Sequence, residues 1–281
     1  MDVGRREHSG ASRESIRELS PVSHSARQLS HALRRIPVVT LDARHLLVFD
    51  GDDTLWETEP LYDIARVEAG LVAAGAGIDP AEFDEVQRSI DLENVGRLGL
   101  SADRFPRSSV QAYERLAATI GRRIDDSLRR RIWAAAASVF ERPAPLLPGA
   151  KSVLSVLAPS HVLALVTKGD VAVQRRRVEQ SGLTQFFRTV QIVDTKSVKT
   201  FTALASELGS RPEDSWSIGN SLPSDIEPAL AAGYSGIWVD AHVWEHERRA
   251  HQVELDQPHL FVASSLLDVP DIVAVTTGPA T

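Results

Sequence analysis

The stretch Leu46-Leu47-Val48-Phe49-Asp50-Gly51-Asp52-Asp53-Thr54 joins a short apolar run to three carboxylates within four positions. An unbroken apolar run of this length is typical of a strand buried on both faces of a parallel sheet. The carboxyl end of such a strand is where α/β folds place their ligands. Carboxylates this close repel one another, and burial would protonate one of them unless a positive charge compensates. The segment therefore favours a site for a divalent cation such as Mg²⁺, which prefers oxygen ligands, although an acidic surface turn stays open.

The rest of the chain predicts an α/β fold. From position 148 onward, apolar runs expected to be strands alternate with helical patterns, the strands at 162–166, 189–193, 215–218, 236–239 and 260–263 and the helices at 150–157, 171–181, 200–208 and 224–232. This alternation builds a doubly wound, Rossmann-like parallel sheet with right-handed crossovers. Residues 60–142 show only helical periodicity, which predicts an α-helical domain inserted after the first strand.

These patterns divide the chain into three parts. We expect a flexible tail at 1–40, because this segment is polar and lacks a strong apolar period. The α/β core domain would comprise 41–58 and 146–281, and the helical domain 59–145.

Composition excludes several classes of protein. The net charge of −7 argues against a broad nucleic-acid surface, which needs clustered Lys and Arg. The absence of Cys excludes disulfides, thiol nucleophiles and Cys-ligated metals. No apolar run reaches the roughly 18 residues that span a membrane, and residues 1–36 contain no apolar signal-peptide core. We expect a cytoplasmic protein that binds neither nucleic acid nor membranes, and the sequence does not indicate an oligomeric state.

Asp50-Gly51-Asp52-Asp53-Thr54, preceded by an apolar strand, resembles the first motif of the haloacid dehalogenase superfamily. That motif is usually Asp-x-Asp-Gly-Thr, so Asp53 stands where the family usually has Gly. The resemblance implies that Asp50 attacks phosphorus and becomes an aspartyl-phosphate. It also implies that Asp52 protonates the leaving oxygen and then activates the hydrolytic water.

The second and third motifs of the superfamily follow in order. The apolar run at 162–166 ends in Thr167-Lys168-Gly169, which by the resemblance binds the substrate phosphate at a strand-to-helix turn. The third motif is a Lys that neutralises the nucleophile and the transferred phosphoryl group. Lys196 and Lys199 both compete for this catalytic and phosphate-binding role. Lys196 is favoured because it lies just past the strand at 189–193 and five residues before Phe201, a spacing that the family shows.

The fourth motif is the acidic loop Gly219-Asn220-Ser221-Leu222-Pro223-Ser224-Asp225. The family usually has Gly-Asp where this chain has Gly219-Asn220, and Asp225 is retained. The resemblance, which covers about residues 45–270, implies a Mg²⁺ cofactor with four ligands: Asp50, Asp52, Asn220 and Asp225.

The helical insertion occupies the position of the superfamily's type C1 cap, which closes over the site and supplies residues that select the substrate. Arg97, Arg104 and Arg107 lie in a stretch expected to be loop-like, together with Asn94 and Ser108, and could hold a phosphate or carboxylate of the substrate. Exposed surface arginines are the alternative for each.

Three further patterns have no firm role. The runs 129–131 and 175–177, each of three Arg, are expected to be solvated helix faces. Trp56 is compatible with stacking on a ligand or with packing. The stretch Trp244-Glu245-His246-Glu247 resembles one subset of the superfamily and has no assigned role.

The activity that the resemblance implies is Mg²⁺-dependent hydrolysis of a small phosphorylated metabolite. Dehalogenases and phosphonatases of the superfamily need no carboxylate at the position of Asp52, and phosphonatases use a cap Lys, whereas residues 60–142 contain none. A phosphomutase keeps Asp52 and stays open as an alternative. A non-catalytic domain that binds a phosphorylated ligand is a further alternative, although both Asp50 and Asp52 are present.

Overall fold

The computed structural model of the protein describes residues 45–240 and 256–277. The tail expected at 1–40 and the stretch Trp244–Glu247 lie outside the described residues. Within the described part of the chain, no helix is both long and apolar enough to cross a membrane.

The core is a parallel sheet of six strands in the order β3-β2-β1-β4-β5-β6. In chain order the strands are β1 (Leu46–Phe49), β2 (Val162–Lys168), β3 (Thr189–Val193), β4 (Ser215–Gly219), β5 (Ser235–Val239) and β6 (Leu260–Ala263). Phe49 at the end of β1 aligns with Leu165 of β2 and Ile218 of β4. This register brings the carboxyl ends of the three central strands to one edge, where the strand order reverses and ligands usually bind.

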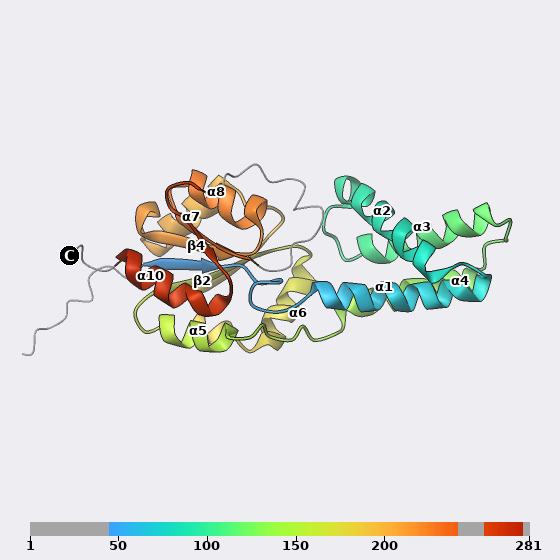
Figure 1. Ribbon diagram of the computed structural model, residues 1–281, viewed down its shortest axis with the longest axis horizontal. Helices are drawn as coiled ribbons and strands as arrows, with labels where there is room; N and C mark the ends of the chain where they lie inside the picture. The colour runs from blue at the N-terminus through green and yellow to red at the C-terminus, as the bar shows by residue number, and fades with distance from the viewer. Residues whose placement is uncertain (1–44, 241–255, 278–281) are drawn as a thin grey trace, which may run out of the picture. The chain divides into compact units, whose positions relative to one another are not determined.

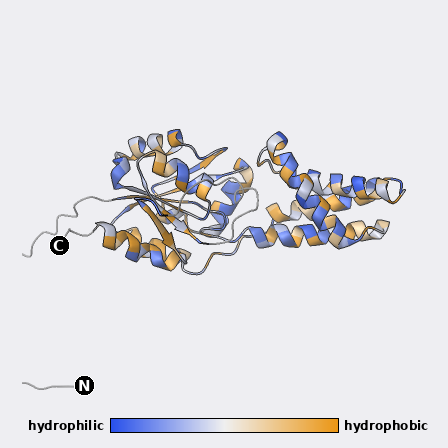
Figure 2. Ribbon diagram, turned by 45° about the horizontal axis from the view of Figure 1, so that its top comes forward, coloured by the Kyte–Doolittle hydropathy of each residue, from blue (hydrophilic) through white to orange (hydrophobic). Residues whose placement is uncertain are grey.

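Helices cover both faces of the sheet (Figure 1). Side chains of β1 alternate between the faces: Leu47 and Phe49 pack toward α5 (Ala150–Leu157), α6 (Val171–Ser181) and α10 (Val269–Thr277). Leu46 and Val48 pack toward α7 (Val198–Leu208) and α8 (Glu227–Ala231). In Figure 2 the helices around the sheet carry both hydrophobic and hydrophilic residues, as expected for helices that pack one face on the sheet and turn the other to water. Burial on both faces explains why β1 is apolar throughout.

The insertion between β1 and β2 contains four long helices. These are α1 (Glu59–Ala73), α2 (Pro80–Leu98), α3 (Arg104–Thr119) and α4 (Asp126–Ala137). They enclose a separate apolar cluster that includes Phe83, Phe105, Tyr113 and Ile132. The fold is therefore the expected α/β core with a helical domain inserted after the first strand.

Short helices complete the described chain: η1 (Ala74–Ala76), η2 (Ser138–Phe140), η3 (Thr184–Phe186), η4 (Pro212–Asp214), η5 (Leu222–Ile226) and η6 (Leu266–Asp268). One local expectation was wrong. The stretch around Arg97–Ser108 is mostly helical, because α2 extends to Leu98 and α3 begins at Arg104. Gly99, with φ of 60°, ends α2 and confines the connection to residues 99–103.

Candidate active site

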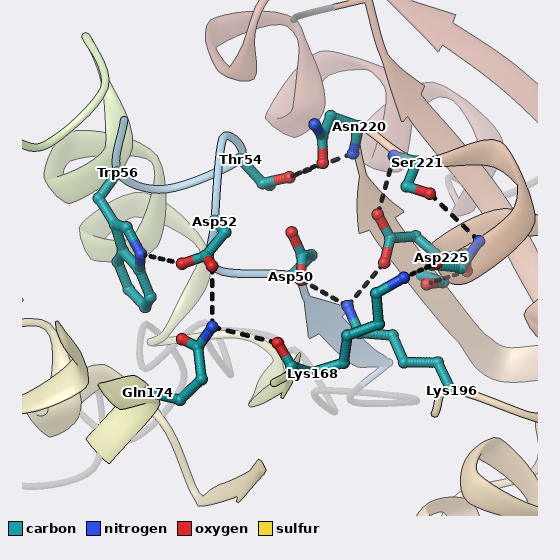
Figure 3. A network of polar contacts seen from close by, with 12 residues as sticks. Asp50, Asp52, Thr54, Trp56, Lys168, Gln174, Lys196, Asn220, Ser221 and Asp225 are labelled. Carbon is teal, nitrogen blue, oxygen red and sulfur yellow. Dashed lines mark hydrogen bonds and ion pairs between the residues drawn. The ribbon is translucent and has the colours of Figure 1, made fainter. Parts of the chain in front are cut away.

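A pocket of about 150 Å³ lies at the carboxyl ends of β1, β2 and β4. Its walls combine Asp50, Asp52, Thr167 and Lys196 of the core with side chains of the helical insertion. Figure 3 shows the polar contacts among the core residues of this pocket, including Asp50, Asp52 and Lys196. The four segments expected from the sequence motifs thus meet in one place.

Lys196 lies between two carboxylates at the base of the pocket. Its Nζ is 2.5 Å from Oδ1 of Asp50 and 2.6 Å from Oδ1 of Asp225 (Figure 3). The amide of Asp50 donates to the carbonyl oxygen of Ile218 at 2.9 Å, which fixes the main chain at the end of β1. Lys199 is exposed on α7. The geometry therefore favours Lys196 over Lys199 as the lysine of the site.

The charges of this cluster are strongly coupled. Burial and the nearby Asp225 raise the pKa of Asp50 to about 7, although Lys196 opposes this shift. Burial alone would lower the pKa of Lys196, but Asp225 and Asp50 outweigh it and raise that pKa. One Lys among these carboxylates leaves the site short of positive charge, which a bound cation would supply.

Asp52 is held by three donors from its own loop and from α6. Nε1 of Trp56 donates to Oδ1 at 2.7 Å, and Nε2 of Gln174 donates to Oδ2 at 2.8 Å. Nη1 of Arg177 donates to the same Oδ2 at 2.6 Å. The expectation that Arg175–Arg177 form a solvated face was wrong for Arg177, whose side chain is 5% exposed. Gln174 and Arg177 are site residues that the sequence reasoning missed, and their i, i+3 spacing on the helix after the second motif is the signal that could have found them.

Trp56 is packed inside the protein and has no exposed face to stack on a ligand. Its ring lies against the main chain of Gly51, where an added Cβ would be 2.4 Å from Cζ2 of the ring. Only glycine fits at this contact, so Gly51 lets the Trp56 indole approach and bind Asp52. Of the two interpretations that the sequence left open for Trp56, packing is the one that the structure supports.

Asp53 connects the first motif to the helical insertion. It has φ of 57°, a left-handed conformation that explains why the family usually has Gly at this position. Its carboxylate accepts hydrogen bonds from the amide and hydroxyl of Thr58, at 2.8 and 2.7 Å, and from the amide of Glu59 at 3.2 Å. Asp53 thus caps the N-terminus of α1, because it binds amides that have no partner inside the helix.

The groups expected to bind phosphate differ in their availability. Oγ1 of Thr167 is buried and finds no hydrogen-bond partner within residues 45–240 and 256–277. Nζ of Lys168 binds Oγ of Ser224 at 2.5 Å, and the amide of Gly169 donates to the carbonyl of Val193 at 3.1 Å. The Thr167 hydroxyl is therefore positioned for a ligand oxygen, whereas the Gly169 amide is already used within the fold.

The loop after β4 orders the remaining polar residues. Asn220 exchanges two hydrogen bonds with Thr54, both 3.1 Å long, so the first and fourth motifs are joined directly. Oδ2 of Asp225 accepts from the amide of Ser221 at 2.9 Å. A Cβ on Gly219 would be 2.2 Å from this Asp225 oxygen, so glycine is required there too.

The donor chemistry of the site fits Mg²⁺ in part. Asp50, Asp225 and Asn220 supply hard oxygen ligands at neighbouring strand ends. The Asp52 carboxylate accepts three hydrogen bonds, from Trp56, Gln174 and Arg177, and is therefore more fully bonded within the protein than the Asp225 carboxylate, which accepts two. Accordingly, no three acidic or His side chains of the described residues converge as a ready metal cluster.

The three arginines expected to select the substrate have different positions. Arg104 is buried and lines the pocket, whereas Arg97 and Arg107 are exposed and do not line it. The helical insertion also contributes Tyr62, whose ring lies 5.9 Å from the Arg177 guanidinium. Neither Tyr62 nor its contact with Arg177 was anticipated, since no local pattern links α1 to α6.

Comparison with known proteins agrees with this arrangement. Residues 45–233 match the model of the haloacid dehalogenase-like hydrolases. The chain therefore belongs to this family of hydrolases. The match begins at β1 and ends after α8, so it includes all four motif segments.

Individual relatives are distant but cover most of the chain. The chain is 29% identical to a phosphoserine phosphatase of Thermus thermophilus over 221 residues, which is 69% of this chain and 88% of the relative. It is 25% identical to the pyrimidine 5'-nucleotidase YjjG of Escherichia coli, over 70% of this chain and 86% of the relative. A haloacid dehalogenase-like hydrolase from Xanthomonas campestris has a similar structure, with a TM-score of 0.68 and 27% identity, and the match covers 83% of this chain and 96% of that one.

Proposed function

We propose that the protein is a Mg²⁺-dependent phosphomonoesterase that hydrolyses a small phosphorylated metabolite through an aspartyl-phosphate on Asp50. One observation carries this proposal: Asp50 lies at the base of the pocket with Lys196 beside it and the unpartnered hydroxyl of Thr167 in the same pocket. A nucleophile, a cation and a free hydroxyl around one space suit a phosphoryl group. Mg²⁺, held by Asp50, Asp225 and Asn220, would supply the further positive charge that this chemistry needs.

In the first step a carboxylate oxygen of Asp50 attacks phosphorus and the bond from phosphorus to the leaving oxygen breaks. Lys196 offsets the charge on the phosphoryl oxygens, and Oγ1 of Thr167 donates to one of them. Protonated Asp52 transfers its proton to the leaving oxygen. We assign this transfer to Oδ1 of Asp52, because Oδ1 has one donor whereas Oδ2 has two.

In the second step the Asp52 carboxylate accepts a proton from water, and the resulting hydroxide attacks phosphorus. The acyl-phosphate bond breaks, inorganic phosphate leaves and Asp50 is restored. Asp52 is again protonated, so one cycle consumes one water and balances. The hydrogen bonds from Trp56, Gln174 and Arg177 would hold the Asp52 side chain in place during both steps.

The named relatives support this class of reaction. They include phosphatases of phosphoserine and of glyceraldehyde 3-phosphate, as well as pyrimidine 5'-nucleotidases. The substrates in their names differ, but all are phosphomonoesters of small metabolites. The cytoplasmic location and the absence of nucleic-acid or membrane partners stay predictions.

The test is release of inorganic phosphate from para-nitrophenyl phosphate and a panel of phosphate esters, with Mg²⁺ and with EDTA. We expect turnover that needs Mg²⁺ and that Asp50→Asn reduces at least about 1,000-fold. Asp194→Asn, which alters an exposed carboxylate just past β3, is the matched control. Metal-independent turnover would contradict the proposed Mg²⁺ requirement. Full activity of Asp50→Asn with an unchanged melting temperature would show the nucleophile to be misassigned. Transfer of the phosphoryl group to a second sugar phosphate, without free phosphate, would instead indicate a mutase.

A further inference from the structure

The helical insertion buries an ion pair in the wall of the pocket. Nη1 of Arg104, at the start of α3, is 3.3 Å from Oδ2 of Asp91 on α2. Arg104 is 7% exposed and Asp91 6%, and both line the same pocket as Asp50. The lost hydration of two buried charges can cost more free energy than their mutual attraction regains. This ion pair is therefore weak evidence for a purely structural role.

Asp91 has an unused acceptor at this position. Its Oδ1 is buried and has no hydrogen-bond partner among the residues that the structure describes. Asn94, one turn further along α2, shows the contrast: its amide donates to Ser108 at 3.0 Å and to Gln111 at 2.7 Å. Asn94 does not line the pocket, whereas Asp91 does. A buried carboxylate oxygen left without a donor inside the protein is suited to a donor on a ligand.

The size of the pocket limits what this ligand can be. Its volume of about 150 Å³ is well below the roughly 300–1,000 Å³ of sites that hold drug-sized molecules. Tyr62 and Phe105 pack edge to face, with ring centroids 5.0 Å apart, and both line the pocket. After the phosphoryl group is placed beside Asp50, the remaining space suits a leaving group of a few heavy atoms better than a nucleoside.

We propose that the leaving group is a small zwitterion, with a carboxylate that binds Arg104 and an ammonium that binds Asp91. This rests on the proposed phosphomonoesterase function and names its substrate class as phosphorylated amino acids, of which O-phosphoserine is the simplest. A zwitterion inserted into the ion pair leaves both protein charges compensated. A ligand with only one of the two charges would leave the other partner buried and unmatched. Arg66 also lines the pocket, but it is already paired with Asp63 and Asp84.

The experiment compares kcat/KM for O-phosphoserine, phosphoethanolamine, 3-phosphoglycerate, uridine monophosphate and para-nitrophenyl phosphate. O-phosphoserine is expected to exceed phosphoethanolamine and 3-phosphoglycerate by at least about 10-fold each, because each of these lacks one charge. Asp91→Asn and Arg104→Met are expected to lower the ratio of O-phosphoserine to para-nitrophenyl phosphate by about 10–100-fold, mainly through KM. Arg97→Met, which changes an exposed arginine in the last turn of α2, is the matched control and is expected to leave that ratio unchanged.

Preference for the nucleotide or for 3-phosphoglycerate would overturn the zwitterion proposal, while Mg²⁺-dependent turnover of para-nitrophenyl phosphate would still support the phosphomonoesterase. A calorimetric titration tests recognition of the zwitterion separately from phosphate hydrolysis, because it measures binding without turnover. Asp50→Asn is expected to bind O-phosphoserine, and the double variant with Asp91→Asn is expected to bind it at least about 10-fold more weakly. Absence of binding to Asp50→Asn, or equal binding by both variants, would refute the recognition of the ammonium by Asp91 whatever the turnover shows.

Discussion

Replacing Arg177 by Met removes the positive charge that binds Asp52 in the described part of the chain. The two side chains are 2.6 Å apart, with exposed fractions of 5% for Arg177 and 28% for Asp52. Losing one partner of a fully buried pair costs about 3–5 kcal/mol, whereas an exposed pair contributes about 0–1 kcal/mol. Since Asp52 is partly exposed, we expect Arg177→Met to lower the free energy of unfolding by about 2–3 kcal/mol. This corresponds to a fall in melting temperature of about 4–10 °C.

The kinetic effect of Arg177→Met should depend on the leaving group. General acid catalysis contributes about 10²–10⁴-fold, and Trp56 and Gln174 would still hold Asp52 in part. We therefore expect kcat/KM for an alkyl phosphate to fall about 10–100-fold. For para-nitrophenyl phosphate the fall should be below about 3-fold, because its leaving group departs without a proton. kcat/KM is the right quantity, since it reports the steps up to the first phosphoryl transfer.

Arg175→Met is the matched control for Arg177→Met, because it changes an exposed arginine of the same helix. Arg177→Lys should give an intermediate loss, since Lys retains the charge but not the planar guanidinium. Equal losses on both substrates would mean that Arg177 acts only on stability. No loss on the alkyl phosphate would refute the claim that it positions Asp52.

Three further predictions follow from particular contacts. Lys196→Met should lower kcat for phosphate release at least about 100-fold, because it removes the cation beside Asp50. The exposed Lys199 is the control, and kcat of Lys199→Met should stay within about 2-fold of the wild type. Comparable losses of kcat in both variants would contradict this assignment. Asp53→Ala should lower the free energy of unfolding by about 1–3 kcal/mol in chemical denaturation, because the variant loses the cap of α1 and keeps the positive φ. Asp53→Gly should lower it less, because glycine adopts a positive φ without strain. A larger loss in Asp53→Gly than in Asp53→Ala would be inconsistent with this account. Burial raises the pKa of Tyr234 from about 10 to about 12, so the neutral phenol favours the folded state. The stability that this group contributes is complete below pH 10 and is lost between about pH 10 and 12. The free energy of unfolding should therefore fall by roughly 2–3 kcal/mol over this range in the wild type, measured by chemical denaturation, but not in Tyr234→Phe.

Residues close in sequence were well predicted. The apolar run that ends at Asp50, the alternation of strands and helices after position 148, and the helical insertion all follow from periods of hydrophobicity that local geometry dictates. The same is true of the four motifs, because each lies where a strand ends, and parallel strands end at one edge. Lys196 could be favoured over Lys199 from spacing alone, although only its contact with Asp50 and Asp225 distinguishes the two in space.

The sequence by itself thus determined the family and the architecture, and it located the carboxylate that we propose as the nucleophile, since these depend on short segments whose structure is largely local. Only the tertiary structure decided which arginines belong to the site. Arg104 and Arg177 are buried against carboxylates of other helices or loops, while Arg97 and Arg175 are exposed on the same kinds of helix. The physical reason is that a charged residue on a helix has the same local pattern whether it faces water or a partner, and the partner is supplied by a segment far away in the chain. For Asp52 that partner is Arg177, which lies 125 residues away in the sequence, on α6.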